Sequence, residues 1–288
     1  MITNNQRAEI LAQALPHIQE YNGKIIVVKY GGNAMINESL KSDVMQDIVL
    51  LNLIGVKVVL VHGGGPELSA LLKRLGHESK FVNGLRVTDD VTAEAALMVL
   101  SGKINKKLAA KIGSFGGRAI GLSGLDSCLI QARTMDPELG FVGDITGINA
   151  EPITDLLEKG YIPVISTVGC DAEGNIYNIN ADTAAAQIAA ELNAESLVSM
   201  TDTPGLLRDK DDPSTLISKI DVSEIPSLIE EGVISGGMIP KVDGMVEAIR
   251  NGVKKVFIID GRLPHAILVE TLTDEGIGTM FVSENPEE

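Results

Sequence analysis

Two glycine clusters suggest chemistry in this sequence, because each one follows an apolar run that is typical of a buried strand. Residues 24–30 (KIIVVKY) end at Gly31-Gly32, and residues 57–61 (KVVLV) lead into Gly63-Gly64-Gly65. Glycines let backbone N–H groups approach an anion closely, and the start of a following helix adds favourable polarity. Either cluster alone is compatible with a simple tight turn. Two clusters at consecutive strand ends, one of them beside Lys29, favour an anion-binding site.

Other signatures of chemistry are absent from the sequence. It contains no G-x-x-x-x-G-K-[ST] loop, and no G-x-G-x-x-G that opens a helix with an acidic residue downstream. The histidines and cysteines are scattered: His17, His62, His77, His265, Cys128 and Cys170. Such spacing argues against a histidine metal cluster, a serine triad, a disulfide framework and a cysteine zinc site. We expect His62 to orient the glycine turn, and a general-base role is the weaker alternative.

Strand-like and helical segments alternate around the glycine clusters. Six apolar runs predict buried strands at residues 24–30, 57–61, 118–122, 161–165, 196–200 and 255–259. Helical patterns occupy residues 38–53, 66–75, 92–112, 182–192 and 240–251. Four prolines stand where a first helical turn accepts them: Pro66, Pro152, Pro240 and Pro264. The alternation predicts an α/β fold, a three-layer α/β/α sandwich with a mainly parallel central sheet.

Some segments depart from this alternation. Residues 81–87 and 127–148 combine short β-like pieces with turn residues, which indicates hairpins, and residues 208–215 are typical of a solvated loop. Residues 3–20 predict a helix ahead of the first strand. Its apolar stripe consists of Ile10, Leu11, Ala14, Leu15 and Ile18. The helix must bury this stripe either against another subunit or against its own.

The bulk composition excludes several classes of protein. Of 288 residues, 44% are hydrophobic and 22% charged, which argues against disorder. The formal net charge of −15 argues against general nucleic-acid binding, which needs a positive surface. No apolar run approaches the roughly 20 residues that span a bilayer, and residues 1–10 do not read as a signal peptide. With only two distant cysteines, we expect a cytoplasmic protein.

Six short blocks carry a resemblance to a known family. They are KYGG (29–32), VHGGGP (61–66), GLRVT (84–88), NINAD (178–182), MTDTPG (200–205) and GGMIPK (236–241). In this order they resemble the acetylglutamate kinases of the amino-acid kinase family, over residues 24–281. Any one block occurs in other amino-acid kinases. The combination of Arg86 with the NINAD block is what points to the acetylglutamate kinases and their close relatives.

The resemblance implies a specific reaction. The γ-phosphoryl group of ATP would pass to the γ-carboxylate of N-acetyl-L-glutamate, the second step of arginine biosynthesis, with Mg²⁺ carried by the nucleotide and no metal-binding residue named. A γ-carboxylate, with a pKa of about 4.3, is already ionised at neutral pH and needs no general base. Catalysis should therefore consist of positioning and charge neutralisation, as in phosphoryl transfer generally.

Three residues are catalytic by this resemblance. Lys29 and Lys241 would neutralise the two anions from opposite lobes, and Asp182 would hold both ammonium groups. Each residue also has a plainer interpretation from the sequence. Lys29 could be a solvated strand-terminal charge, Asp182 could be a helix N-cap, and Lys241 could be only a first-turn residue. A cation is poorly placed at a helix start, which favours the functional interpretation of Lys241.

The remaining site residues divide between two substrates. The planar fork of Arg86 suits the α-carboxylate, with a surface hairpin charge as the alternative. Asn178 suits the N-acetyl amide, although a turn asparagine is possible there. By resemblance, the acceptor also contacts Gly64, Gly65 and Asn180. The nucleotide-binding residues implied are Gly31, Gly32, Thr201, Asp202, Gly205, Leu206, Gly236 and Gly237.

The resemblance also implies domains and control. Residues 1–22 would form an N-terminal arm, residues 23–193 an acetylglutamate-binding lobe and residues 194–288 an ATP-binding lobe. The arm resembles that of arginine-inhibited members, which assemble as hexamers, three dimers in a ring. L-arginine would bind near the arm, where His17 lies, and near Glu275 and Gly278. Two alternatives stay open: a kinase for carbamate, aspartate, uridylate or an aminoadipate derivative, or a non-catalytic arginine sensor.

Overall fold

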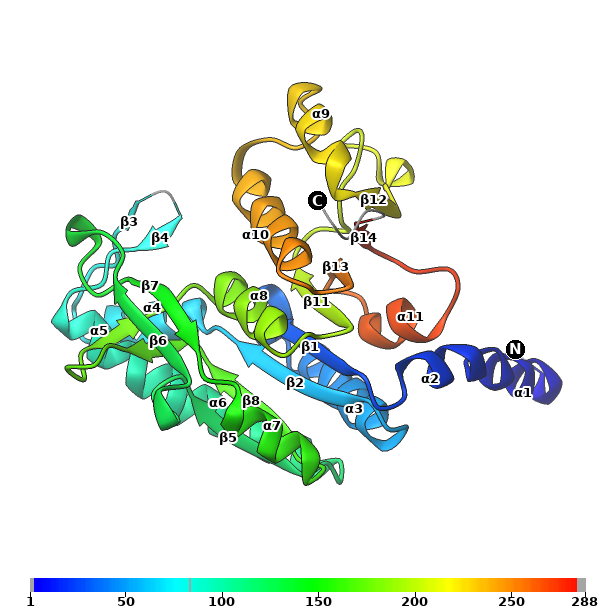
Figure 1. The fold of residues 1–288 in the computed structure, drawn as a ribbon, viewed down its shortest axis with the longest axis horizontal. Helices are drawn as coiled ribbons and strands as arrows, with labels where there is room; N and C mark the ends of the chain where they lie inside the picture. The colour runs from blue at the N-terminus through cyan, green and yellow to red at the C-terminus, as the bar shows by residue number, and fades with distance from the viewer. Residues whose placement is uncertain (1–2, 83, 284–288) are drawn as a thin grey trace.

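An eight-stranded sheet forms the middle layer of the protein in a computed structural model that describes residues 3–82 and 84–283 (Figure 1). Its strand order is β12-β14-β13-β11-β1-β2-β8-β5. The strands are β1 Ile25–Tyr30, β2 Lys57–His62, β5 Ala119–Ser123, β8 Ile162–Ser166, β11 Ser196–Thr201, β12 Lys219–Asp221, β13 Lys255–Asp260 and β14 Thr279–Val282. The six predicted strands are all present and parallel, and β14 pairs antiparallel with β13.

Helices cover both faces of this sheet. The helical segments on one face are α3 Glu38–Leu53, α4 Gly65–Arg74, α5 Asp90–Leu97, η2 Met98–Ile104, α6 Asn105–Ser114 and α11 Ala266–Leu272. Those on the other are α7 Glu151–Glu158, α8 Ala181–Glu191, α9 Ile225–Glu230 and α10 Ile239–Arg250. Strand β1 divides its side chains between the two cores, with Ile26 and Val28 in the first and Val27 in the second. The predicted three-layer α/β/α sandwich is confirmed.

The predicted helix over residues 92–112 is a succession of three helical segments. Between α5 and α6, residues Met98–Ile104 form a π-helix, η2. The wider turn changes which side chains face the sheet, and π segments inside helices often occur near functional sites. The sequence pattern predicted helix here but not this change of pitch.

Smaller sheets lie at the carboxyl end of the main one. Strands β6 Ile130–Thr134, β7 Gly143–Ile148, β9 Val168–Cys170 and β10 Ile176–Asn178 form a second sheet, and β3 Phe81–Val82 pairs with β4 Leu85–Arg86. The predicted hairpins are therefore present. Short 3₁₀ turns complete the chain: η1 Gly32–Met35, η3 Asp126–Cys128, η4 Pro137–Leu139, η5 Pro213–Thr215, η6 Val222–Glu224 and η7 Gly236–Met238. One proline prediction was wrong: α11 begins at Ala266, after a left-handed His265, so Pro264 precedes the helix.

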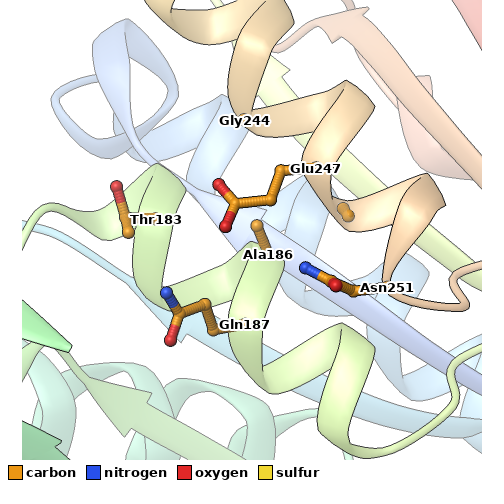
Figure 2. Close-up of a pocket in the computed structure, with 7 residues that line it drawn as sticks. Thr183, Ala186, Gln187, Gly244, Glu247 and Asn251 are labelled. Carbon is orange, nitrogen blue, oxygen red and sulfur yellow. The ribbon is translucent and has the colours of Figure 1, made fainter. Parts of the chain in front are cut away.

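Helices α8 and α10 lie side by side on one face of the sheet (Figure 2). Small residues stand between them: Ala186, Gly244 and Ala248. Thr183, Gln187, Glu247 and Asn251 surround a cavity of about 30 Å³ at this contact (Figure 2). The two helices therefore meet through small side chains and a polar rim.

The N-terminal segment forms two helices, α1 Asn4–Gln13 and α2 Leu15–Tyr21, where one was predicted. Pro16 stands in the first turn of α2, where proline starts a new helix more readily than it continues one. Helix α1 lies at one end of the molecule (Figure 1). The apolar stripe is divided: Ile18 packs against the core, whereas Leu11 is 76% exposed. Residues 1 and 2 of the predicted arm lie outside the described residues, as do residues 284–288 of the predicted ATP-binding lobe.

Across residues 3–82 and 84–283, no helix is long and apolar enough to cross a bilayer.

Gly124 provides a test of the packing between β5 and the second sheet. A Cβ atom at Gly124 would lie 1.9 Å from the carbonyl oxygen of Val168, so Gly124→Ala must displace backbone. We expect this change to lower the free energy of unfolding by ~1–3 kcal/mol, as overpacking usually does. Gly113→Ala is the matched control, because a Cβ there meets nothing within 4 Å and Gly113 is in α6. Denaturant unfolding should leave the control unchanged or more stable. Equal stability of the two variants would contradict the packing.

Candidate active site

The ends of three neighbouring strands bring the predicted glycine clusters together. Strand β1 lies between β2 and β11, with Lys29 beside Val61 on one side and Ser199 on the other. Since the strands are parallel, the segments that follow them leave the sheet at the same edge. Gly31-Gly32 and Gly63-Gly64-Gly65 therefore lie near one another, as expected.

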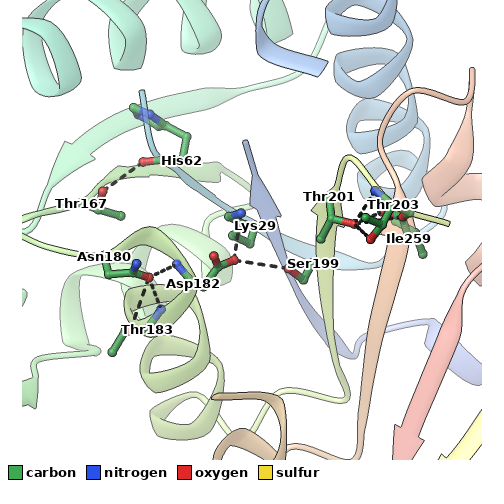
Figure 3. A network of polar contacts seen from close by, with 10 residues as sticks. All are labelled: Lys29, His62, Thr167, Asn180, Asp182, Thr183, Ser199, Thr201, Thr203 and Ile259. Carbon is green, nitrogen blue, oxygen red and sulfur yellow. Dashed lines mark hydrogen bonds and ion pairs between the residues drawn. The ribbon is translucent and has the colours of Figure 1, made fainter. Parts of the chain in front are cut away.

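A buried ion pair lies at this edge. The Nζ atom of Lys29 is 2.8 Å from Oδ1 of Asp182, which also accepts a 3.4 Å hydrogen bond from the Ser199 hydroxyl (Figure 3). Burial alone would raise the pKa of Asp182, but the charges of Lys29 and Lys241 and the hydrogen bonds outweigh it and hold the pKa below its ordinary value. Lys29 is only 8% exposed. The alternative of a solvated strand-terminal charge is therefore wrong.

Asp182 is not the N-cap of α8, which corrects one alternative from the sequence. The cap is Asn180, whose Oδ1 accepts hydrogen bonds from the backbone N–H groups of Asp182 and Thr183 at 2.9 and 3.1 Å (Figure 3). Because Asn180 satisfies the helix start, the carboxylate of Asp182 is left for Lys29. The NINAD block thus supplies both a cap and a buried anion.

Lys241 differs from Lys29 in its position, which is on a helix and not at a strand end. It lies in the first turn of α10, directly after Pro240, and is partly buried. Its charge lowers the pKa of Asp182, so the two groups sense one another's field. Among the ion pairs of the described residues, Asp182 is joined to Lys29 and not to Lys241. The expectation that Asp182 holds both ammonium groups is therefore met by direct contact only for Lys29.

A pocket of about 190 Å³ opens beside the ion pair. All five residues predicted to bind the acceptor line it: Gly64, Gly65, Arg86, Asn178 and Asn180. These residues come from three segments far apart in the chain: the start of α4, the β3–β4 hairpin, and the stretch between β10 and α8. The fold therefore brings together what the sequence only suggested as a set.

Arg86 reaches this pocket from a buried position. Its Nη2 donates to Ser69 Oγ at 2.7 Å and to the Gly65 carbonyl at 3.2 Å, and its Nη1 donates to Ser79 Oγ at 2.5 Å. The guanidinium carbon also stands 4.6 Å from the centre of the Phe81 ring. Burial lowers the pKa of Arg86 from a very high ordinary value. The alternative of a surface hairpin charge is wrong, because Arg86 is 8% exposed.

Asn178 is a strand residue, which disagrees with the alternative of a turn asparagine. It ends β10, and its backbone N–H donates to the Phe141 carbonyl at 2.9 Å. Its side-chain Nδ2 donates to Thr88 Oγ1 at 3.3 Å. The hydroxyl of Thr88 in turn donates to the carbonyl of Arg86. Asn178 and Arg86 are thereby linked through one threonine.

His62 holds the second glycine turn from behind. Its ring is fully buried, with Nδ1 2.8 Å from the Gly63 carbonyl and Nε2 3.2 Å from the amide nitrogen of Asn105. Burial lowers its pKa to about 4, so the imidazole is neutral at neutral pH. The carbonyl of His62 accepts from the Thr167 hydroxyl (Figure 3). The expected role in orienting the turn is confirmed, and both ring nitrogens are engaged, which argues against a general base.

The predicted nucleotide-binding residues occupy the neighbouring strand ends. A Cβ at Gly32, where φ is +67°, would lie 2.6 Å from Oδ1 of Asp202, so these two segments approach closely. Gly31 is similarly close to the Lys29 ammonium group. Gly236 and Gly237 form the turn η7 that leads into α10 and Lys241. Gly31 therefore borders the ion pair, whereas Gly236 and Gly237 precede Lys241 in the chain.

Two of the nucleotide-binding predictions need correction in their side chains. Leu206 is 2% exposed and packs in the core, while its backbone N–H donates to Thr279 Oγ1 at 2.8 Å. The Thr201 hydroxyl holds the following turn through the Thr203 carbonyl at 3.0 Å (Figure 3). A left-handed Gly205 leaves room for Thr279 Oγ1, which a Cβ would approach to 2.6 Å. These residues shape the loop, so their contact with a ligand would be made by backbone.

The predicted regulatory residues are also brought together. Nε2 of His17, in α2, lies 3.2 Å from Oδ1 of Asp274, next to an exposed Glu275. Gly278 is buried, and its N–H donates to Oε2 of Glu270 at 2.9 Å. The arm and residues 274–278 are therefore in contact, and Glu270, which the sequence did not single out, organises that segment.

Residues that sequence reasoning missed are mostly single polar side chains. They are Ser69, Ser79, Thr88, Asn105, Ser199 and Glu270. Only Thr88 belongs to one of the six blocks, and the role of each residue comes from a contact outside its own turn of chain. The one signal available was that Asn105 interrupts a helical apolar pattern close to Gly102.

Known proteins with similar sequences and structures place this site in context. A model of the Amino acid kinase family matches residues 24–260. The chain is 55% identical to "Acetylglutamate kinase" of Brachyspira hyodysenteriae over 97% of its length and 98% of that protein, and 54% identical to "Acetylglutamate kinase" of Clostridium beijerinckii over 98% and 100%.

A solved structure agrees with this relationship. N-acetylglutamate synthase from Neisseria gonorrhoeae, complexed with coenzyme A and N-acetyl-glutamate, superimposes with a TM-score of 0.85 at 26% identity. It covers 96% of this chain, and the chain spans 64% of the synthase. Carbamate kinase from Giardia lamblia, 20% identical with a TM-score of 0.66, shares the fold. The chain belongs to the amino-acid kinase family and, within it, to the acetylglutamate kinases.

Proposed function

We propose that this chain transfers the γ-phosphoryl group of ATP to the γ-carboxylate of N-acetyl-L-glutamate. The observation that carries the proposal is the buried Lys29–Asp182 pair, which lies at a strand edge shared by two glycine turns and beside the Arg86 pocket. Relatives more than 50% identical over nearly the whole chain are named for this reaction. Site chemistry and relationship therefore support the same function.

The acceptor fits the pocket through its two ends. Among the described residues the Arg86 guanidinium gives one N–H of Nη1 and both of Nη2 to protein acceptors, which leaves the Nε–H and the second Nη1–H to donate to an α-carboxylate. Asn178 offers an amide group for the N-acetyl end. With these ends fixed, the γ-carboxylate points to the glycine turns and the ion pair. A substrate without the acetyl group would place a second cation in this pocket.

The transfer step needs charge neutralisation and no proton movement. A γ-carboxylate oxygen forms a bond to the γ-phosphorus while the bond from phosphorus to the β–γ bridging oxygen breaks, and ADP leaves with the electron pair. Lys29 and Lys241 approach the reacting anions from the two sides, and Asp182 keeps Lys29 aimed. Backbone N–H groups of Gly32, Gly64 and Gly65 would contact the transferring phosphoryl group.

The remaining assignments follow from this arrangement. We assign the acceptor to residues 23–193 and the nucleotide to residues 194–288, and we expect the enzyme to act in the cytoplasm. Among the described residues no group of three or more His, Cys, Asp or Glu could hold a metal. In this proposal the Mg²⁺ ion is held by the nucleotide phosphates, whose charge it would help neutralise.

The product provides the first test. An acyl phosphate reacts with hydroxylamine to give a hydroxamate, so incubation with Mg²⁺-ATP, N-acetyl-L-glutamate and hydroxylamine should yield that adduct. Free glutamate, aspartate, carbamate and N-acetyl-aminoadipate form the substrate panel, and we expect N-acetyl-L-glutamate to give the highest kcat/KM. Turnover of aspartate or carbamate at an equal rate would reject the assignment, and no turnover of any acceptor would favour a non-catalytic sensor.

Charge removal separates catalysis from binding. Lys29→Ala should lower kcat by ~10²–10³, the loss typical of one electrostatic stabiliser. Arg86→Lys keeps the charge but loses the fork, so it should raise KM for the acceptor ~10–100-fold with little effect on kcat, because the α-carboxylate does not change during transfer. Lys24→Ala, an exposed lysine outside the site, is the control. An unchanged kcat in Lys29→Ala would place the chemistry elsewhere.

We also propose control by L-arginine through the N-terminal arm. The exposed side chains Ile10, Leu11 and Leu15 would be buried against another subunit in a hexamer. His17 contacts the segment that contains Glu275 and Gly278, so a ligand bound there would sense both arm and core. A related structure, N-acetylglutamate synthase from Neisseria gonorrhoeae, is complexed with coenzyme A and L-arginine. Inhibition requires arginine to prefer a less active arrangement.

Deletion of residues 1–13 tests this control, because it removes α1 and leaves α2 packed on the core. Full-length protein should be a hexamer by light scattering and should be inhibited by L-arginine. The deletion variant should form dimers that ignore arginine at unchanged basal activity. His17→Ala is the companion variant, which should weaken inhibition and keep the hexamer. A full-length dimer insensitive to arginine would refute the regulation and leave the kinase assignment intact.

A further inference from the structure

The tautomer of His62 is fixed by its neighbours. The Gly63 carbonyl can only accept a hydrogen bond, so Nδ1 of His62, at 2.8 Å, must carry the proton. Nε2 is then an acceptor, and the amide N–H of Asn105 donates to it at 3.2 Å. The ring is fully buried, so water cannot replace either partner.

Asn105 is itself held by two strands. Its Nδ2 donates to the Leu122 carbonyl at the end of β5, at 2.9 Å, and to the Val164 carbonyl in β8, at 2.8 Å. Together with His62 Nε2 this makes three acceptors for two N–H groups, so one N–H is shared between His62 Nε2 and a carbonyl, and the three acceptors fix the orientation of the amide. The other end of the amide, Oδ1, is buried and has no hydrogen-bond partner among the described residues.

The surroundings make room for this amide. A Cβ at Gly121 would lie 2.0 Å from Asn105 Oδ1, so a side chain there would displace it. The π-helix η2 ends one residue before Asn105. Its side chains Leu100 and Ile104 pack against the glycine turn at Gly64. A Cβ at Gly64 would meet them at 2.6 and 2.3 Å.

Peptide geometry links the His62 ring to the acceptor pocket. The Gly63 carbonyl and the Gly64 N–H belong to one planar trans peptide, in which they point in opposite directions. A ring that holds the carbonyl on the buried side therefore turns the Gly64 N–H to the other side, where Gly63, Gly64 and Gly65 line the acceptor pocket. Rotation of this peptide would withdraw a donor from the site.

We infer that Asn105 is a positioning residue for phosphoryl transfer, acting through His62 to aim the Gly64 N–H into the site. This inference rests on the proposed function. Asn105 touches neither substrate, and its effect is on the orientation of one backbone donor. Because that donor acts most on charge that develops during transfer, its loss lowers kcat more than it raises either KM.

The first experiment uses Asn105→Ala with Leu108→Ala as its matched control. Leu108 is buried in the same helix and lies outside the site, so its truncation lowers stability without touching the relay. We expect Asn105→Ala to lower kcat at least ~10-fold, with both KM values within about threefold of wild type. Leu108→Ala should retain kcat at comparable loss of unfolding free energy. Equal kcat values in the two variants would overturn the inference.

The second experiment needs no activity. Side-chain ¹⁵N NMR at neutral pH should show wild-type His62 as the pure Nδ1–H tautomer. Asn105→Ala should show a mixture, because without the Asn105 N–H the ring and the Gly63 peptide can rotate apart and Nε2 can carry the proton. A wild-type Nε2–H tautomer, or a variant that retains pure Nδ1–H, would overturn the relay. If the wild type forms no hydroxamate, the proposed function fails by itself, whatever the tautomer. The two failures are therefore distinguishable, and circular dichroism of Asn105→Ala confirms that the variant is folded.

Discussion

A single buried contact, the ion pair between Lys29 and Asp182, explains why the surrounding elements are arranged as they are. A lysine with 8% exposure at the end of a central strand requires an anion within reach. That anion is available only because Asn180, two residues earlier, caps α8 in its place. The Asp182 carboxylate is therefore free to pair with Lys29 because the side-chain oxygen of Asn180 accepts the N–H groups at the start of α8. Removal of Asp182 would leave the ammonium group of Lys29, at 8% exposure, without its ion-pair partner.

Much of this organisation was evident from the sequence. Long apolar runs predicted the six central strands, since a parallel strand that is covered on both faces has no polar positions to break its pattern. The residues expected to bind the acceptor are all found around one pocket, because strand ends and the segments after them are local features of the sequence. Blocks such as NINAD and VHGGGP also keep their chemistry within a few residues.

Other features could not be predicted, and the reason is physical. The pitch change in Met98–Ile104 comes from packing against the glycine turn, which no local pattern records. Both Asn180 and Asp182 are residue types that cap helices. Only the three-dimensional structure shows that α8 begins after Asn180, so that Asn180 is the N-cap. Leu206 was expected beside a ligand but lies in the core. Partners such as Thr88 and Asn105 are single polar residues whose roles exist only after distant segments meet.

The continuous sheet has a mechanical consequence. Strand β1 belongs to the proposed acceptor lobe and β11 to the nucleotide lobe, yet they pair directly from Ile26–Ser196 to Lys29–Ser199. The two lobes are therefore joined by paired strands, and any opening between them must change the twist of this sheet. Outside the sheet, α8 and α10 meet through Ala186, Gly244 and Ala248, whose small side chains offer little resistance to sliding. A stiff central sheet covered by helices that can slide favours small elastic movements of the lobes over wide hinge opening.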